Sequence, residues 1–190
     1  HKKALPISWC MFFIMIAFGA IIIFAGIYAG QKEFSNISTF FLCFSAAIFV
    51  SRVFLGKLFD RGYFFQLILV ALALTAIGMI WLGYAPSPTH FLVGGILNGL
   101  GFGILLPTCQ AAINTLVDSS ERGAANSTYL LSYDLGIGSS SLLVGFLSEK
   151  IALGVIYRYS AIVILLAAGI FVFRVMPHYR RNRLKYIVRV

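Results

Sequence analysis

The sequence predicts an all-α membrane protein, folded as one bundle of six transmembrane helices. Of its 190 residues, 60% are hydrophobic and only 11% are charged, whereas soluble domains average about 25% charged residues. Apolar runs of roughly 20 residues, the length that spans a bilayer as a helix, recur along the whole chain. No run alternates polar and apolar residues over its full length, as the strands of a membrane barrel do.

Six apolar runs are separated by short polar or proline-containing turns. They cover residues 5–29, 37–55, 63–85, 91–117, 123–147 and 155–176. The third run stops at Pro86 and Pro88, because proline cannot continue the hydrogen bonding of a helix. The turns 52–62 and 118–122 are short and charged. We therefore expect a transmembrane bundle over residues 1–176 and a basic tail over residues 177–190.

The six runs divide into two sets of three, on either side of the Pro86–Pro88 turn. Because each set has an odd number of spans, the second set is inverted relative to the first. Inverted three-helix repeats are a recurrent plan of secondary transporters. The hydropathy pattern thus predicts a 3+3 inverted repeat.

The net charge of +9 is concentrated at the ends of the runs. One predicted membrane side carries twelve basic residues: Lys2, Lys3, Arg52, Lys57, Arg61, Arg122, Arg174, Arg180, Arg181, Arg183, Lys185 and Arg189. The other side carries three: Lys32, Lys150 and Arg158. The positive-inside rule then predicts a multi-pass protein of the cell membrane with both ends of this segment in the cytoplasm. No basic stripe is interleaved with aromatic residues, so the expected partner is the lipid bilayer and not a nucleic acid.

Asp134 is the one acidic residue deep inside an apolar run. It lies about eleven residues, or roughly 16 Å, from the start of the fifth span, near the middle of a ~30 Å hydrocarbon core. A carboxylate facing lipid there costs at least ~2.5 kcal/mol, so an intramembrane acid is a candidate functional residue. Two interpretations stay open: a group that binds protons or substrate, and an acid hydrogen-bonded to a neighbouring helix.

The fourth span carries small and amide-bearing residues at helical spacing. Gly95, Gly99 and Gly103 recur every four residues, which lets another helix approach closely. Gln110 falls on nearly the same face as Gly99, and Asn98 adds a second amide. We expect the glycines to serve helix packing. For Asn98 and Gln110, lining a substrate cavity and bonding to a neighbouring helix are both open.

Tyr133, next to Asp134 in the fifth span, can hydrogen-bond a ligand or act as an aromatic filler, and the second interpretation is favoured. The sequence has no phosphate-binding glycine loop and no catalytic Ser–His or Cys–His arrangement. Its three cysteines, Cys10, Cys43 and Cys109, fit no metal-site spacing. We therefore expect no enzyme, no bound metal and no cofactor other than a proton as coupling ion.

Four motifs in their order resemble one transporter family. Arg52 precedes the loop sequence Gly-Lys-Leu-Phe-Asp-Arg-Gly of residues 56–62, and the glycine-rich residues 99–103 precede Pro107. Residues 121–128 and 134–138 complete the set. Together they resemble the C-terminal half of a Major Facilitator Superfamily transporter, in particular the bacterial drug- and metabolite-efflux members.

The resemblance implies a twelve-helix protein of two six-helix bundles that bind substrate between them and rock to alternate access. The missing partner is an N-terminal six-helix half, and a first residue of His in place of Met agrees with a segment of a longer chain. The resemblance also implies a conformational latch formed by Arg52, Gly56, Asp60 and Arg61. In it, Asp60 accepts hydrogen bonds from the amino end of the fifth helix, where free amides and the helix dipole favour an anion.

The leading hypothesis is a proton-coupled exporter of small amphipathic compounds or metabolites. In it, Asp134, Asn98, Gln110 and Tyr133 line the pathway of substrate or proton. An importer or facilitator of the same superfamily is one alternative. A six-span membrane assembly module with no transport activity is another.

Overall fold

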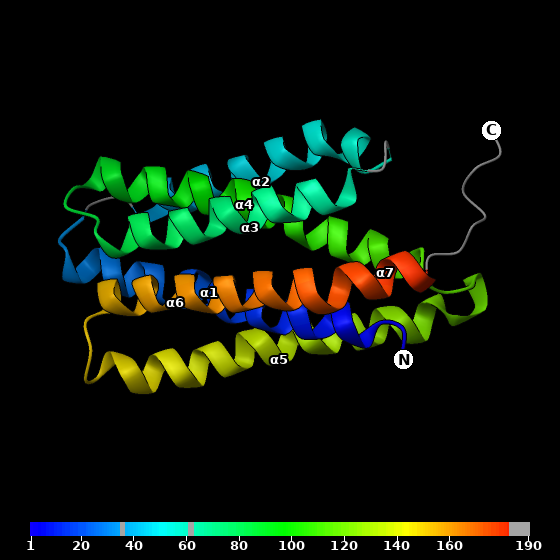
Figure 1. Ribbon diagram of the computed structural model, residues 1–190. Coiled ribbons are helices and arrows are strands. Elements are labelled where there is room, and N and C mark those ends of the chain that lie inside the picture. Colours follow the sequence, from blue (N-terminus) through cyan, green and yellow to red (C-terminus); the bar gives the residue numbers. More distant parts are fainter. Residues whose placement is uncertain (35–36, 61–62, 183–190) are drawn as a thin grey trace.

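The computed structural model describes residues 1–34, 37–60 and 63–182, with the side chains of residues 54–60 excepted. Within these ranges every regular element is a helix, as predicted. The helices are α1 (Leu5–Gln31), α2 (Ile37–Asp60), α3 (Phe64–Gly83), α4 (Pro88–Asn114), α5 (Arg122–Ser148) and α6 (Leu153–Ile170). A 3₁₀ turn, η1 (Ser119–Glu121), precedes α5. Figure 1 shows the long helices running along one common direction, with the start of the chain and α7 (Met176–Asn182) at the same end of the bundle.

The sixth helix is longer than the sequence predicts. After α6 the chain passes through a π-helical turn, η2 (Phe171–Val175), and continues as α7 (Met176–Asn182). Residues 177–182 of the predicted tail are therefore helical, and Tyr179 among them is buried. Its hydroxyl lies 3.1 Å from the Thr115 hydroxyl, which ties α7 to the end of α4.

Five of the described helical segments are long and apolar enough to cross a membrane: Leu5–Gln31, Phe64–Gly83, Pro88–Asn114, Ser119–Ser148 and Leu153–Asn182. The apolar part of α2, Ile37–Val53, is shorter, although the helix itself has 24 residues. This composition and the absence of strands from the described residues agree with a helical membrane protein.

The carboxyl end of α1 is capped by a backbone motif that no single residue type predicts. The amide of Phe34 donates to the Ala29 carbonyl at 2.9 Å, and the amide of Glu33 donates to Gly30 at 3.1 Å. Glu33 takes a φ of 56° to allow this, in the manner of a Schellman motif. The turn delivers the Phe34 ring to Phe91 at the start of α4, with 5.7 Å between ring centroids.

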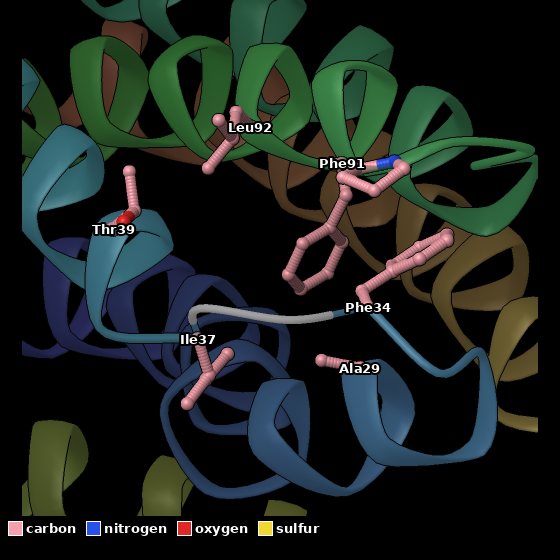
Figure 2. Close-up of a pocket in the computed structure, with 7 residues that line it drawn as sticks. Ala29, Phe34, Ile37, Thr39, Phe91 and Leu92 are labelled. Carbon is pink, nitrogen blue, oxygen red and sulfur yellow. The ribbon is translucent and has the colours of Figure 1, made fainter.

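Figure 2 shows the hollow that these two rings flank. Its volume is about 150 Å³, and its walls are apolar except for the Thr39 hydroxyl and backbone. The lining residues are Ala29, Phe34, Ile37, Thr39, Pro88, Phe91 and Leu92. With a single polar side chain, the hollow offers little to orient a polar ligand.

The packing of the helices follows the predicted inverted repeat. α1 packs against α5 and α6, while α4 packs against α2 and α3, and α3 contacts α6. Exchanging α1 with α4, α2 with α5, and α3 with α6 reproduces the same set of neighbours. The two sets of three helices are thus interlocked: the second helix of each set packs on the first helix of the other set.

Glycines allow the closest of these approaches. A Cβ atom on Gly136 of α5 would lie 2.5 Å from the Met15 Cβ of α1, and one on Gly19 would lie 2.7 Å from the Ser140 Cβ. The corresponding pair, α4 and α2, is joined by the Gly95, Gly99 and Gly103 stripe described below. The side chains that fill the interior are large and apolar, and most residues of α1 are buried.

Candidate functional site

Asp134 lies on a surface of α5 that no other described helix covers. Its side chain is exposed, as are Ser127 and Ser141, seven residues to either side. Within the described residues, its carboxylate has no hydrogen-bond or ion-pair partner. The described residues thus show no hydrogen bond between Asp134 and a neighbouring helix, and both interpretations from the sequence stay predictions.

The exposed surface of α5 includes two stripes of different character, beside other exposed residues such as Leu130 and Leu143. One, which we call the polar stripe, falls within an arc of roughly 60° and comprises Gly123, Ser127, Asp134, Gly138 and Ser141. The other, the apolar stripe, is turned by roughly 80° and comprises Leu131, Leu135, Leu142 and Phe146. Hydrocarbon covers leucine and phenylalanine readily but disfavours a carboxylate. The two stripes therefore suit different surroundings.

Gln110 and Asn114 share one side of α4, where Gln110 is exposed. Two hydrogen bonds fasten this region to α5. The Asn126 amide donates to the Asn114 side-chain oxygen at 2.8 Å, and the Tyr129 hydroxyl donates to the Leu106 carbonyl at 2.8 Å. The exposed amide of Gln110 thus lies beside the polar side of α5.

Tyr133 is half-buried, with its ring 6.3 Å from that of Phe18. Its hydroxyl lies within electrostatic range of both the Asp134 carboxylate and the Arg52 guanidinium of α2. Arg52 also acts on the Tyr129 hydroxyl. Arg52 of α2, Gln110 of α4 and Asp134 of α5 are exposed, and Tyr133 of α5 is half-buried. We call these four side chains the polar surface.

Asn98 is placed elsewhere. It is fully buried, and its amide donates to the Gly94 carbonyl of its own helix at 2.8 Å. It faces α3, because a Cβ atom on Gly78 would lie 2.6 Å from its side-chain nitrogen. This position gives Asn98 a packing role between α3 and α4, away from the polar surface, and a role in a substrate pathway stays a prediction.

The three glycines of α4 face α2. A Cβ atom on Gly95 would lie 2.7 Å from the Phe40 ring, and one on Gly99 would meet the Phe44 carbonyl oxygen. A Cβ atom on Gly103 would overlap the Ser51 hydroxyl. At each position the neighbour lies where a side chain would begin, so α2 and α4 approach closely along this stripe.

The latch residues are described only in part. The surroundings of Gly56, the side chain of Asp60 and the whole of Arg61 lie outside the described residues, so the latch stays a prediction. Arg52 is described and exposed on α2. Across the connection, a Cβ atom on Gly123 would meet no atom of the described residues within 4 Å. The chain start lies beside the same end of α5, with the His1 amino group 2.9 Å from the Thr128 hydroxyl.

Two features of the site were not predicted from the sequence. One is the hydrogen bond between the side chains of Asn114 and Asn126. The sequence contains a signal for it, because the two residues lie six positions before and six positions after residue 120 in the η1 turn, and such equally spaced residues face each other in antiparallel helices. The other is the approach of Arg52 to Tyr133, which joins segments far apart in the chain. Within the described residues, no three His, Cys, Asp or Glu side chains cluster to hold a metal ion.

Comparisons with known proteins agree with this geometry. The model of the Major Facilitator Superfamily matches residues 5–187. An uncharacterized MFS-type transporter of Pseudomonas aeruginosa is 30% identical over 134 residues, which is 70% of this chain and 33% of the relative. One of Burkholderia mallei is 27% identical over 153 residues, 80% of this chain and 37% of the relative. The chain spans about a third of the length of these relatives, and it belongs to the Major Facilitator Superfamily.

Proposed function

We propose that this chain is the C-terminal six-helix half of a secondary transporter that exports small amphipathic compounds or metabolites in exchange for protons. The observation that carries the proposal is the position of Asp134 on the polar stripe of α5. A carboxylate near the membrane midplane needs water or protein around it. A companion six-helix half facing the polar surface would supply that environment, while lipid covers the apolar stripe.

In this proposal the polar surface is one wall of the substrate pathway. Asp134 takes up a proton from one side of the membrane and releases it on the other. Arg52, Gln110 and Tyr133 offer hydrogen-bond donors to the polar end of a substrate, and the exposed apolar residues around them suit its hydrocarbon part. By the alternating access of the family, this wall is exposed first to one side of the membrane and then to the other, with Asp60 and Arg61 as the proposed latch.

We further propose that the end of the bundle that carries the chain start, η1 and α7 faces the cytoplasm of the cell. The support is the distribution of Lys and Arg along the sequence, with twelve expected on that side and three on the other, which the positive-inside rule interprets. The missing half, the bilayer and the substrate are the partners that this arrangement requires.

The test uses the full-length protein that contains this chain, in inside-out vesicles energised by an imposed proton gradient. Uptake of amphipathic fluorescent dyes, ethidium among them, reports export, and a pH-sensitive dye reports proton movement. We expect Asp134→Asn to lower gradient-driven uptake at least about a hundredfold, in the range for losing a proton-transfer group, and to abolish substrate-dependent proton movement. Asp118→Asn, which neutralises an exposed carboxylate in the turn before α5, is the matched control.

Full uptake and unchanged pH dependence in Asp134→Asn would refute the coupling role. Dye movement down its own gradient with no proton movement in the wild-type protein would instead indicate a facilitator. Accumulation only in right-side-out vesicles would indicate an importer.

A further inference from the structure

A strongly basic hollow lies where η2 and α7 pass the start of α1. It has a volume of about 420 Å³, and Arg174 and Arg181 are on its wall together with Pro6 and Phe173. The two arginines are seven residues apart, which places them on nearly the same side of the helix. Both are exposed, and within the described residues neither guanidinium is paired with a carboxylate.

The helix around this hollow is locally altered and well anchored. The π-helical turn η2 includes Arg174 and presents Phe173, 79% exposed, toward the surroundings. π-helical turns inside α-helices often mark functional positions. His178 holds α7 in place, because its Nε2 lies 2.9 Å from the Lys3 carbonyl oxygen.

Two apolar hollows lie on either side of Trp9, and both are lined by Leu5 and Trp9. The first, about 290 Å³, lies between α1 and α6 and shares Pro6 and Arg174 with the basic hollow. The second, about 230 Å³, lies between α1 and α5 and includes Phe12 and Leu135. It follows α1 from Leu5 to Phe12, roughly 10 Å along the helix axis. Trp9 itself is 57% exposed.

We propose that these three hollows together bind one anionic phospholipid of the bilayer. Its phosphate lies between Arg174 and Arg181, and its two acyl chains descend on either side of the Trp9 ring. Guanidinium groups recognise phosphate through paired N–H donors, and basic pockets on membrane proteins bind acidic lipid headgroups. Within the described residues the Trp9 indole N–H has no protein acceptor, so it is free to donate to the lipid's ester region, as tryptophans at membrane interfaces do.

Charge complementarity selects this occupant. A protein helix would fill apolar hollows equally well, but it would gain nothing from two unpaired guanidinium groups unless it carried acids there. A free phosphate ion would satisfy the arginines and leave the apolar hollows uncovered. A phospholipid matches both parts, and it is present at high concentration wherever this bundle is inserted. The inference does not depend on which compound is transported.

Trp9 gives a direct readout of the site. The full-length protein is placed in bilayers of phosphatidylcholine that contain a small fraction of brominated phosphatidylglycerol or, separately, of brominated phosphatidylcholine. Bromine quenches tryptophan fluorescence at short range, and subtracting the signal of Trp9→Phe isolates the contribution of Trp9. We expect Trp9 to be quenched at much lower fractions of the anionic lipid than of the neutral one.

The arginines should account for that preference. Neutralising one of them, in Arg174→Gln or Arg181→Gln, should weaken the preference about fivefold, and the double variant about 25-fold, as expected for charges near a membrane surface. The double lysine variant should retain most of it, because it keeps both charges. Arg180→Gln is the matched control, since the Arg180 guanidinium instead lies 5.1 Å from the Phe65 ring centroid. It removes an equal charge from the same helix and should leave the preference within twofold of wild type.

Each other outcome overturns the proposal. Equal quenching by both lipids means that ordinary surrounding lipid covers Trp9. Quenching by neither means that protein covers the hollows. Loss of the anionic preference when chloride is replaced by inorganic phosphate at equal ionic strength assigns the arginines to free phosphate. An unchanged preference in a correctly folded double glutamine variant, as judged by size-exclusion chromatography, removes the arginines from the site.

Discussion

The contact between α4 and α2 makes a sharp prediction, because one chemical change should have opposite effects at two glycines. In Gly99→Ala, the new methyl group meets the Phe44 carbonyl oxygen and lies 2.8 Å from the Ala47 Cβ. Neither atom belongs to a flexible side-chain end, so the two helices must separate. At Gly169 of α6, a Cβ atom meets nothing within 4 Å.

The magnitudes follow from two opposing terms. Replacing glycine by alanine inside a helix stabilises it by up to ~1 kcal/mol, and this gain applies at both positions. Overpacking against a rigid neighbour costs typically ~1–3 kcal/mol, and this cost applies only at Gly99. With the cost near its upper value, Gly99→Ala should lower the free energy of unfolding by about 2 kcal/mol. Gly169→Ala should raise it by about 0.5–1 kcal/mol.

The assay is unfolding of the full-length protein in mixed micelles of increasing SDS fraction, followed by far-ultraviolet circular dichroism. Both variants and the wild type are measured at the same protein concentration. A Gly99→Ala variant as stable as Gly169→Ala would refute the close approach of α2 and α4. A fall in stability of both variants would contradict the open space around Gly169 of α6.

Two further stability changes follow from contacts at single residues. Arg158→Ala removes the hydrogen bond from its guanidinium to the Gly83 carbonyl, 3.2 Å away at the end of α3, and the contact 4.5 Å from the Tyr84 ring centroid. The same assay should show a fall of about 1–2 kcal/mol in the free energy of unfolding. A variant as stable as the wild type would show that these two Arg158 contacts do not stabilise the bundle. Glu33→Gly relieves the left-handed conformation of a residue with a side chain and should gain about 0.5–1 kcal/mol. Lys32→Gly, at a φ of −95°, should lose stability, and equal effects of the two glycine variants would rule out the left-handed turn.

The sequence predicts the helices well because hydropathy and proline are local signals. The starts of α1 and α5 lie within one residue of the predicted runs, and α4 begins at Pro88, where proline fits the first helical turn. The end of the sixth helix was missed because residues 177–182 are polar enough to resemble a tail. What keeps them helical is tertiary: Tyr179 is buried and contacts Thr115.

The site was predicted less completely, because its residues meet across helices. Asp134, Gln110 and Tyr133 are prominent in the sequence as polar side chains in apolar runs, and all three lie on or beside the polar surface. Asn98 gave the same local signal yet lies buried against α3. The difference is the side of α4 on which each amide lies, and that depends on which neighbour packs there. Arg52 was predicted as part of a latch, and its position near Tyr133 depends on the tilt of α2.

The polar surface is held together by the same contacts that make the bundle rigid. α5, which carries Asp134, is pressed against α1 through Gly136, and α2, which carries Arg52, is pressed against α4 through Gly99. Close-packed interfaces of this kind do not slide continuously, because small displacements create overlap or voids. We therefore expect Asp134 and Arg52 to keep their relative positions while access alternates. Under the proposed function, the motion that opens and closes the pathway would then fall between this bundle and a companion half, which would approach or leave the polar surface as a whole.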